Sequence, residues 1–367
     1  MLIERTTVGL DVHARSVVAE AVDWSTGETF SARLVPQNEV VVDWVAGLPG
    51  PAAVTYEAGP TGFGLARAFA TAEVRCEVVA PSKLERPPGD RVKTDRRDAR
   101  RLARLLHIGE ITGIRVPTIE EEDARDLVRA REAARADLMR ARHRLSKLLL
   151  RHGIVYYGGR TWTGEHDRWL RHQLLTLSSE PLLQGTKAAF QESYDAVLTV
   201  TARRDRLDEQ IAVTAASPAW APVVSRLGAI RGIAALTGLG LAVELGDWTR
   251  FTGASIGAYL GLVPTESSSG TTRAQGSITK TGNAHARRLL VEASWHHSKH
   301  LRPEGKAVAA RRAGLPPALR ARGQAADHRL HHRWTTMLAR GKNPSIIAVA
   351  VARELAGWCW SLATMDT

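Results

Sequence analysis

The chain has 367 residues, 44% of them hydrophobic, which excludes a disordered polypeptide and allows two or three globular domains. Lysine and arginine total 50 against 38 aspartates and glutamates, a formal charge of +12, which favours a polyanionic partner such as DNA or RNA. Two distant cysteines argue against a disulfide framework and against a zinc cluster. We find no uninterrupted run of about eighteen apolar residues and no signal-peptide layout, so we expect a cytoplasmic protein outside the membrane.

The N-terminal part alternates between strand and helix patterns. Residues 6–35 read as three short strands separated by polar turns, which favours an antiparallel meander. The elements expected after them are helix 38–48, strand 52–58, helix 61–72, strand 75–81 and helix 95–107. The order βββαβαβ followed by a helix is that of the ribonuclease H-like nuclease fold, an α/β arrangement.

Four acidic residues stand where this fold would bring them together. Asp11 lies between apolar neighbours in the first strand, where a buried carboxylate needs a partner or a metal ion. Glu57 ends the fourth strand, which lies beside the first in this fold. Asp95 and Asp98 lie a turn apart on an arginine-rich helix, where ion pairs on a solvated face would also explain them. The convergence of all four favours a divalent metal site, for Mg²⁺ first and Mn²⁺ as the alternative.

The middle of the chain has a helical texture. Residues 120–152 carry a heptad pattern of leucine and alanine that is broken at Arg131, which predicts a long helix able to form a coiled coil and an oligomer. Cations outnumber acids on this helix, so we expect it to contact nucleic-acid phosphates, although a solvated face is the alternative. The arginines expected on phosphate here and on the acidic helix are Arg135, Arg142, Arg144, Arg96 and Arg97.

The C-terminal part begins near the sequence SPAWAP at 217–222. Residues 227–251 resemble a helix-hairpin-helix, a module whose backbone amides can hold a phosphate. A polar loop rich in serine and glycine follows and opens into a basic helix. We expect Lys280, Arg287 and Arg288 to contact phosphate there.

Four segments carry a family resemblance: GLDVHA, YEAGPTG, KTDRRDARRLA and GLVPTESSSG…ITKTGNAHARRLLVEA. They resemble the DEDD transposases of the insertion sequence 110 family, which are related to the Piv DNA invertases. The resemblance implies a RuvC-like nuclease domain, a coiled-coil domain and a C-terminal transposase domain, placed here at 1–115, 116–216 and 217–367. It also implies a structured bridge RNA that pairs with donor and target DNA.

The same resemblance assigns roles to individual residues. The family's metal-binding tetrad corresponds to Asp11, Glu57, Asp95 and Asp98, and its nucleophilic serine to Ser269 ahead of Gly270, with Ser268 and Ser267 as alternatives. The expected function is therefore site-specific DNA transposition through a serine-linked phosphodiester. Two rivals remain open. One is a RuvC-type junction nuclease in which a metal activates water, and the other is a nucleic-acid-binding protein whose carboxylates are remnants.

Overall fold

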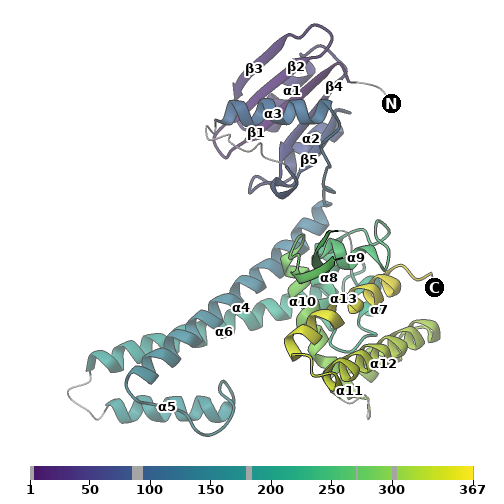
Figure 1. Ribbon diagram of the computed structural model, residues 1–367. Helices are drawn as coiled ribbons and strands as arrows, with labels where there is room; N and C mark the ends of the chain where they lie inside the picture. Colours follow the sequence, from purple (N-terminus) through teal and green to yellow (C-terminus); the bar gives the residue numbers. More distant parts are fainter. Residues whose placement is uncertain (1–3, 85–93, 179–183, 270–271, 300–303, 367) are drawn as a thin grey trace. The chain divides into compact units, whose positions relative to one another are not determined.

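The computed structural model describes residues 4–84, 94–178, 184–269, 272–299 and 304–366 (Figure 1). It divides into two compact units, Met1–Thr118 and Ile119–Thr367, and each is considered by itself. The expected boundary between the middle and C-terminal segments, near residue 216, lies inside the second unit. The division into three segments therefore stays a prediction.

The first unit is built on a five-stranded mixed sheet in the order β3-β2-β1-β4-β5. Its strands are β1 (Thr6–Val12), β2 (Val17–Asp23), β3 (Thr29–Leu34), β4 (Ala52–Glu57) and β5 (Arg75–Val79). Its helices are α1 (Asn38–Ala46), α2 (Gly64–Thr71) and α3 (Asp95–His107). The first three strands are antiparallel, whereas β4 pairs in parallel with both β1 and β5. The ribonuclease H-like arrangement expected from the sequence is confirmed.

Alternating side chains of the central strands face opposite layers. Val8 and Leu10 of β1 pack with Tyr56 of β4 into a core that includes residues of α1 and α2. The odd-numbered positions of β1 face α3 instead, since successive strand residues point to opposite sides. Figure 1 shows α3 crossing the sheet on that face.

Gly9 lets α3 rest directly on β1. A Cβ atom at this position would lie 1.8 Å from the carbonyl oxygen of Ala99, so no larger residue fits without moving the helix. Two residues earlier, the Thr7 hydroxyl donates a hydrogen bond of 2.8 Å to the carbonyl of Ala103. Two strand residues span about 6.6 Å and four helix residues about 6 Å, so contacts recur at every second residue of β1 and every fourth residue of α3. Asp11 consequently comes opposite Asp95.

We expect Gly9→Ala to destabilise the protein by about 1–3 kcal/mol, the usual range for an added methyl group in a packed interior. The added methyl would push α3 away from the sheet. Urea unfolding of the full chain measures this, with Gly47→Ala as the control, because a Cβ at Gly47 meets no atom closer than 3.6 Å. Equal unfolding midpoints for the two variants would contradict the close packing of α3 on β1.

The second unit begins with a long antiparallel helix pair (Figure 1). Helices α4 (Ile119–Arg151) and α6 (Gln184–Ala215) run along each other, and α5 (Gly164–Ser178) packs near one end of the pair. The long helix expected over 120–152 is confirmed. Two members of its heptad pattern, Leu127 and Leu148, are only partly buried, whereas their neighbours Val128 and Leu149 are buried. Arg131, which breaks the heptad, forms a salt bridge of 2.7 Å with Asp208 of α6. The seam therefore contacts a helix of the same chain, and an oligomer through this segment stays a prediction.

The rest of the second unit is mainly helical, as expected. Its elements are α7 (Ala221–Leu227), α8 (Ala235–Leu245), α9 (Ser255–Tyr259), β6 (Pro264–Ser269), β7 (Thr272–Ile278), α10 (Ala284–Ser294), α11 (Lys306–Ala313), α12 (Pro317–Ala339) and α13 (Pro344–Ala363). Helices α7 and α8 are short and joined by a glycine-containing turn, as in the helix-hairpin-helix pattern. The polar loop expected after α9 is instead the antiparallel hairpin β6–β7. Cross-strand pairing orders this polar segment, which has little β-propensity of its own.

Helix α13 is long and apolar enough to cross a membrane by length and composition. Its side chains nevertheless belong to the core of the second unit. Ile347, Val351 and Leu355 are fully buried in one cluster with residues of α8, α10 and α12. This is the pattern of a core helix in a globular protein.

Candidate functional site

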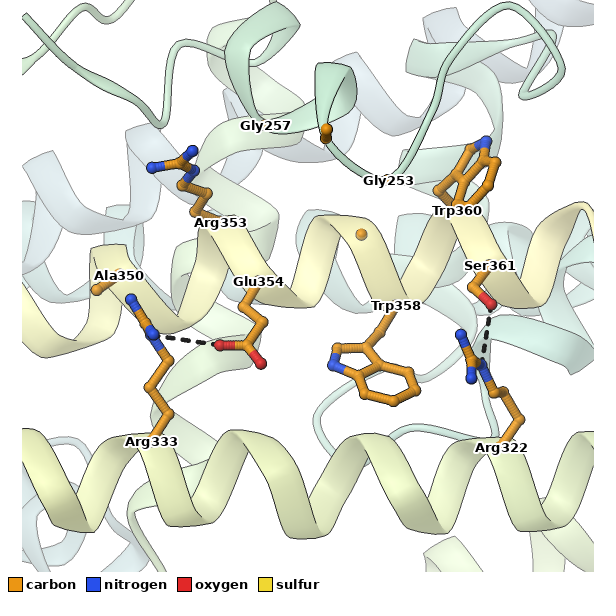
Figure 2. A pocket seen from close by; sticks show the side chains of 12 residues that line it. Gly253, Gly257, Arg322, Arg333, Ala350, Arg353, Glu354, Trp358, Trp360 and Ser361 are labelled. Carbon is orange, nitrogen blue, oxygen red and sulfur yellow. Dashed lines mark hydrogen bonds and ion pairs between the residues drawn. The ribbon is translucent and has the colours of Figure 1, made fainter.

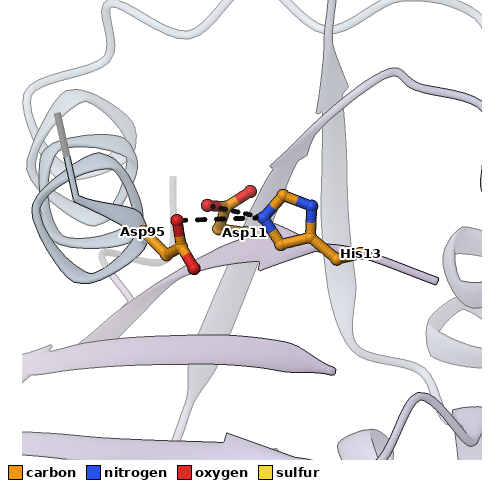
Figure 3. Close-up of side chains that lie close together, drawn as sticks. All are labelled: Asp11, His13 and Asp95. Carbon is orange, nitrogen blue, oxygen red and sulfur yellow. Dashed lines mark ion pairs between the residues drawn. The ribbon is translucent and has the colours of Figure 1, made fainter. Parts of the chain in front are cut away.

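Three potential metal ligands meet where β1 ends and α3 begins (Figure 3). His13 Nε2 lies 3.2 Å from Asp11 Oδ2 and 4.0 Å from Asp95 Oδ1. One ligand atom from each residue lies within 4.8 Å of the other two. The packing of α3 on β1 places these residues together. Thr7 contacts Ala103 and Gly9 contacts Ala99, so two residues further along β1 Asp11 lies opposite Asp95, four residues earlier in α3.

His13 was not among the candidates from the sequence. It follows Asp11 by two residues, and in an extended chain that spacing puts both side chains on one face. This spacing was the available signal for it. His13 is more than half exposed, so its imidazole can reach a ligand as well as the two carboxylates.

The carboxylates crowd one another. Partial burial raises the pKa of Asp11, His13 opposes this rise, and the charges of Asp95 and Asp98 add to it, leaving the pKa above its ordinary value. A bound divalent cation would offset the desolvation of the charged Asp11 carboxylate and the repulsion between the carboxylates. Carboxylate oxygens suit hard cations such as Mg²⁺ and Mn²⁺, and an imidazole is tolerated by several divalent metals. The donor set therefore fits a divalent ion.

The other two predicted ligands lie beside this group. Leu10 of β1 pairs with Tyr56 of β4, so Asp11 and Glu57 occupy the next positions of two parallel strands and lie on the same face. Asp98 lies one helical turn after Asp95. Among the described residues, however, the group within 4.8 Å contains neither Glu57 nor Asp98.

The start of α3 is held in place by its own polar residues. Thr94 caps the helix by accepting a hydrogen bond of 3.3 Å from the backbone N–H of Arg97. Arg96 donates to the buried carboxylate of Glu20 at 2.7 Å and to Ser31 at 2.8 Å. A surface hollow of about 420 Å³, lined in part by Thr94, Asp95 and Arg96, adjoins this point. Arg96 therefore fixes the helix that carries Asp95, and its predicted contact with phosphate stays a prediction, as does that of the exposed Arg97.

Comparison with known proteins identifies the family of the chain that carries this site. Residues 8–154 match a DEDD transposase model of the IS110 group, and residues 224–310 match the model described as transposase IS116/IS110/IS902 family. The y4qE protein of Sinorhizobium fredii, assigned as a transposase, is 40% identical over 84% of this chain and 74% of its own length. The chain is a transposase of the IS110 family. The transposase for insertion sequence element IS1533 of Leptospira borgpetersenii is 30% identical over 91% of this chain and 97% of its own.

Membership of this family settles the reaction class. A transposase is a DNA-binding enzyme that transfers phosphoryl groups, and its DEDD domain implies a divalent metal. The acidic cluster at Asp11 and Asp95 lies within the DEDD match. The serine-bearing segment lies within the second match.

The three candidate serines of the transposase lie on the hairpin strand β6. Ser267, Ser268 and Ser269 are all exposed, and Ser269, the last residue of β6, pairs with Thr272 of β7. The Ser268 hydroxyl donates a hydrogen bond of 2.8 Å to Glu266 Oε1. Two positions used in the sequence argument, Gly270 and Lys93, lie outside the described residues. Strand alternation separates Ser268 from Ser267 and Ser269, which share the other face.

The base of this hairpin is tightly closed. Gly282 has a φ of +68°, and a Cβ there would lie 1.9 Å from the carbonyl oxygen of Tyr259. Arg287 donates hydrogen bonds to the carbonyls of Leu260 at 2.9 Å and Thr281 at 2.7 Å. Arg287, expected on phosphate, thus braces the two ends of the hairpin together.

A buried carboxylate links the same region to α4. Glu244 of α8 accepts hydrogen bonds from Arg129 at 3.0 Å and Asn283 at 2.6 Å, and His285 Nδ1 lies 3.0 Å from it. Asn283 also caps α10, immediately after the hairpin. Burial alone would raise the pKa of Glu244, but the hydrogen bonds of His285, Arg129 and Asn283 outweigh it and lower the pKa to about 2. Glu244 is the one charged residue in α8, a sequence signal that was not used.

The remaining predicted phosphate contacts differ in their surroundings. Arg135 pairs with Glu132 at 2.8 Å, and Arg288 pairs with Glu132 and with Glu292. Arg142 lies 4.9 Å from the ring centre of Trp162, and its burial lowers its pKa. Arg144 and Lys280 are exposed. The paired arginines would have to exchange partners to bind phosphate, so all five contacts stay predictions.

Proposed function

We propose that this transposase breaks and rejoins DNA through a serine-linked phosphodiester at a metal site formed by Asp11, Glu57, Asp95 and Asp98. The observation that carries the proposal is the meeting of Asp11, His13 and Asp95 in the domain that matches the DEDD family. When bound, a divalent ion, Mg²⁺ first and Mn²⁺ second, would stabilise charge on the transferring phosphate.

The serine contributes the covalent step. The Ser269 hydroxyl would lose its proton to a base as its oxygen attacks the scissile phosphorus, the bond to the leaving DNA oxygen would break, and that oxygen would take up a proton in turn. A serine hydroxyl is a weak nucleophile at neutral pH and needs a base or a metal ion close by. We infer that the acidic cluster of the same chain or of another copy supplies the metal ion that activates Ser269. In the rejoining step another DNA hydroxyl displaces the serine.

Partners follow from the charge and from the family resemblance. We infer that the protein acts on donor and target DNA in the cytoplasm, with a structured guide RNA choosing the sites. The charge of +12 supports binding of two polyanions. We also infer a dimer or tetramer, because joining two DNA segments requires more than one cleavage centre.

Incubation with Mg²⁺, the RNA that copurifies with the protein, and end-labelled DNA tests the serine step. A denaturation-resistant protein–DNA adduct is expected in the wild type and in Ser267→Ala, and none in Ser269→Ala, which should still bind DNA. Mass spectrometry of the adduct then locates the nucleotide.

The other outcomes are informative in different ways. A nucleotide found on Ser268 would support the serine-linked mechanism but assign the nucleophile to Ser268. Glu266, which accepts the hydrogen bond of Ser268, would then be the adjacent proton acceptor. Cleavage without an adduct in any variant would favour the RuvC-type nuclease, in which activated water leaves free DNA ends.

A further inference from the structure

A groove with arginine and tryptophan walls runs along α13 in the second unit (Figure 2). This groove, which we call the α13 groove, has a volume of about 400 Å³. Its lining includes Gly253, Gly257, Arg322, Arg353, Glu354, Trp358 and Trp360. Neither the acidic cluster nor the serine hairpin contributes to it. None of the phosphate contacts expected from the sequence lies in it either.

Close packing shapes the groove. The ring of Trp360 lies against Gly253, where a Cβ would come within 3.4 Å of it. The Arg353 side chain lies against Gly257, where a Cβ would come within 3.0 Å. Figure 2 shows Trp360 beside Gly253 and the guanidinium of Arg353 pointing away from the helix axis. Small residues on the opposing chain therefore leave room for both large side chains.

The charge of the groove is positive. Its one acid, Glu354, already accepts a hydrogen bond of 2.6 Å from Arg329 and pairs with Arg333 at 3.3 Å. Arg322 lies over the Trp358 ring at 4.5 Å from its centre and donates to Ser361 at 2.9 Å. Within the described part of the chain, Arg353 makes no ion pair. An anion entering the groove would meet Arg322 and Arg353 without a neutralising carboxylate.

The indole N–H of Trp360 lies beneath the surface of the groove. Trp360 Nε1 is buried and has no hydrogen-bond partner among the described residues. Because this nitrogen has almost no accessible surface, Trp360 contributes its ring to the groove wall and not a hydrogen bond to a ligand. The groove thus offers aromatic rings and two cations.

We propose that the α13 groove binds an unpaired nucleotide of a single-stranded nucleic acid. The backbone phosphate pairs with Arg322 and Arg353, and the base stacks on the Trp358 ring in the place that the Arg322 guanidinium leaves. Bases expose their faces for stacking only when they are unpaired, and stacking on an aromatic side chain is tolerant of sequence. The volume matches a ligand of mononucleotide size at the lower end of known small-ligand sites. The proposal does not depend on the serine-linked step.

Fluorescence anisotropy with a labelled single-stranded oligonucleotide tests this on the full-length protein. DNA and RNA of one sequence form two arms, and the same DNA as a duplex forms a third. Trp358→Leu should weaken single-strand binding about tenfold, the effect of losing one base stack. Arg353→Gln should weaken it several-fold more than Arg340→Gln, a control that removes the same charge from an exposed position outside the groove.

Photocrosslinking supplies a readout of position. An oligonucleotide carrying 5-iodouracil should crosslink to a peptide from α13 in the wild type and lose that crosslink in Trp358→Leu. Tighter binding of the RNA arm would assign the groove to a guide strand, and tighter binding of the DNA arm to a separated DNA strand. Equal effects of Arg353→Gln and Arg340→Gln, or equal losses on duplex and single strands, would overturn the proposal even if Trp358→Leu failed to fold.

Discussion

Asp11→Asn should abolish DNA cleavage and joining, by about a thousandfold or more, while the protein stays folded. Asparagine keeps the volume of the side chain but removes the charged oxygen that a divalent cation requires, and a loss of several kcal/mol of charge stabilisation corresponds to this factor. The charge is not needed for folding, because burial and the neighbouring Asp95 and Asp98 already disfavour it and raise the pKa of Asp11. The metal-free variant should therefore melt no lower than the wild type.

Thermal unfolding with and without Mg²⁺ measures the metal part of this prediction. A ligand at one hundred times its Kd stabilises the folded state by about 2.7 kcal/mol, so Mg²⁺ should raise the wild-type melting temperature. It should not raise that of Asp11→Asn. Asp43→Asn removes an exposed carboxylate from α1, on the other side of the same sheet, and should behave as wild type. A wild-type melting temperature indifferent to Mg²⁺, together with an active Asp11→Asn, would eliminate the metal site.

Glu244→Gln should lower the free energy of unfolding by about 3 kcal/mol. Removing the charge of a fully buried carboxylate breaks its pairing with Arg129 and His285, and the loss of one partner from a buried ion pair typically has an effect of about 3–5 kcal/mol. The lower end applies because the Arg129 side chain is 56% exposed and can return to water. Urea unfolding of the full chain measures the difference.

The stabilisation that Glu244 provides should decrease as the pH falls. Folding lowers the pKa of Glu244 from 4.5 to about 2, so its contribution is fully present above pH 4.5 and is lost as the pH falls towards 2. The gap between wild type and Glu244→Gln should be constant from neutral pH to about 4.5 and narrow below it. Asp137→Asn breaks partly exposed pairs with Arg140 and Arg203 and should change stability by less than about 1 kcal/mol. Similar losses for Glu244→Gln and Asp137→Asn would refute the role of the buried network.

The order of elements in the first unit could be predicted because each element leaves a local pattern. The alternating apolar residues of β1 and the spacing of Ala99, Leu102 and Leu106 in α3 depend only on which face of each element is buried. Asp11 was identifiable for the same reason, since an acid in an apolar strand stands out. The long helix α4 was equally clear from its periodicity.

Other features depended on partners distant in the sequence. The serine segment reads as a loop because its residues have little β-propensity, and only pairing with β7 makes Ser267 and Ser269 strand residues. The heptad seam of α4 could equally have faced a second chain, and its contact with α6 decided otherwise. Arginines expected on DNA, such as Arg287, proved to have backbone or carboxylate partners that no spacing rule reveals.

By itself, the sequence determined the class of fold in the first unit, the acidic residues on its strands and helix, the length of α4 and the family. The fold class, the acidic residues and the helix length follow from local periodicity and from residue types at fixed spacing, whereas the family was indicated by the resemblance of four segments and shown by the comparisons. The tertiary structure alone decided that Asp95 meets Asp11 and His13, that Glu244 contacts Arg129, Asn283 and His285, and that Trp358 and Arg322 line one groove. These contacts join distant segments through side-chain packing, and the free energy of such packing depends on three-dimensional shape that neighbours along the chain do not encode.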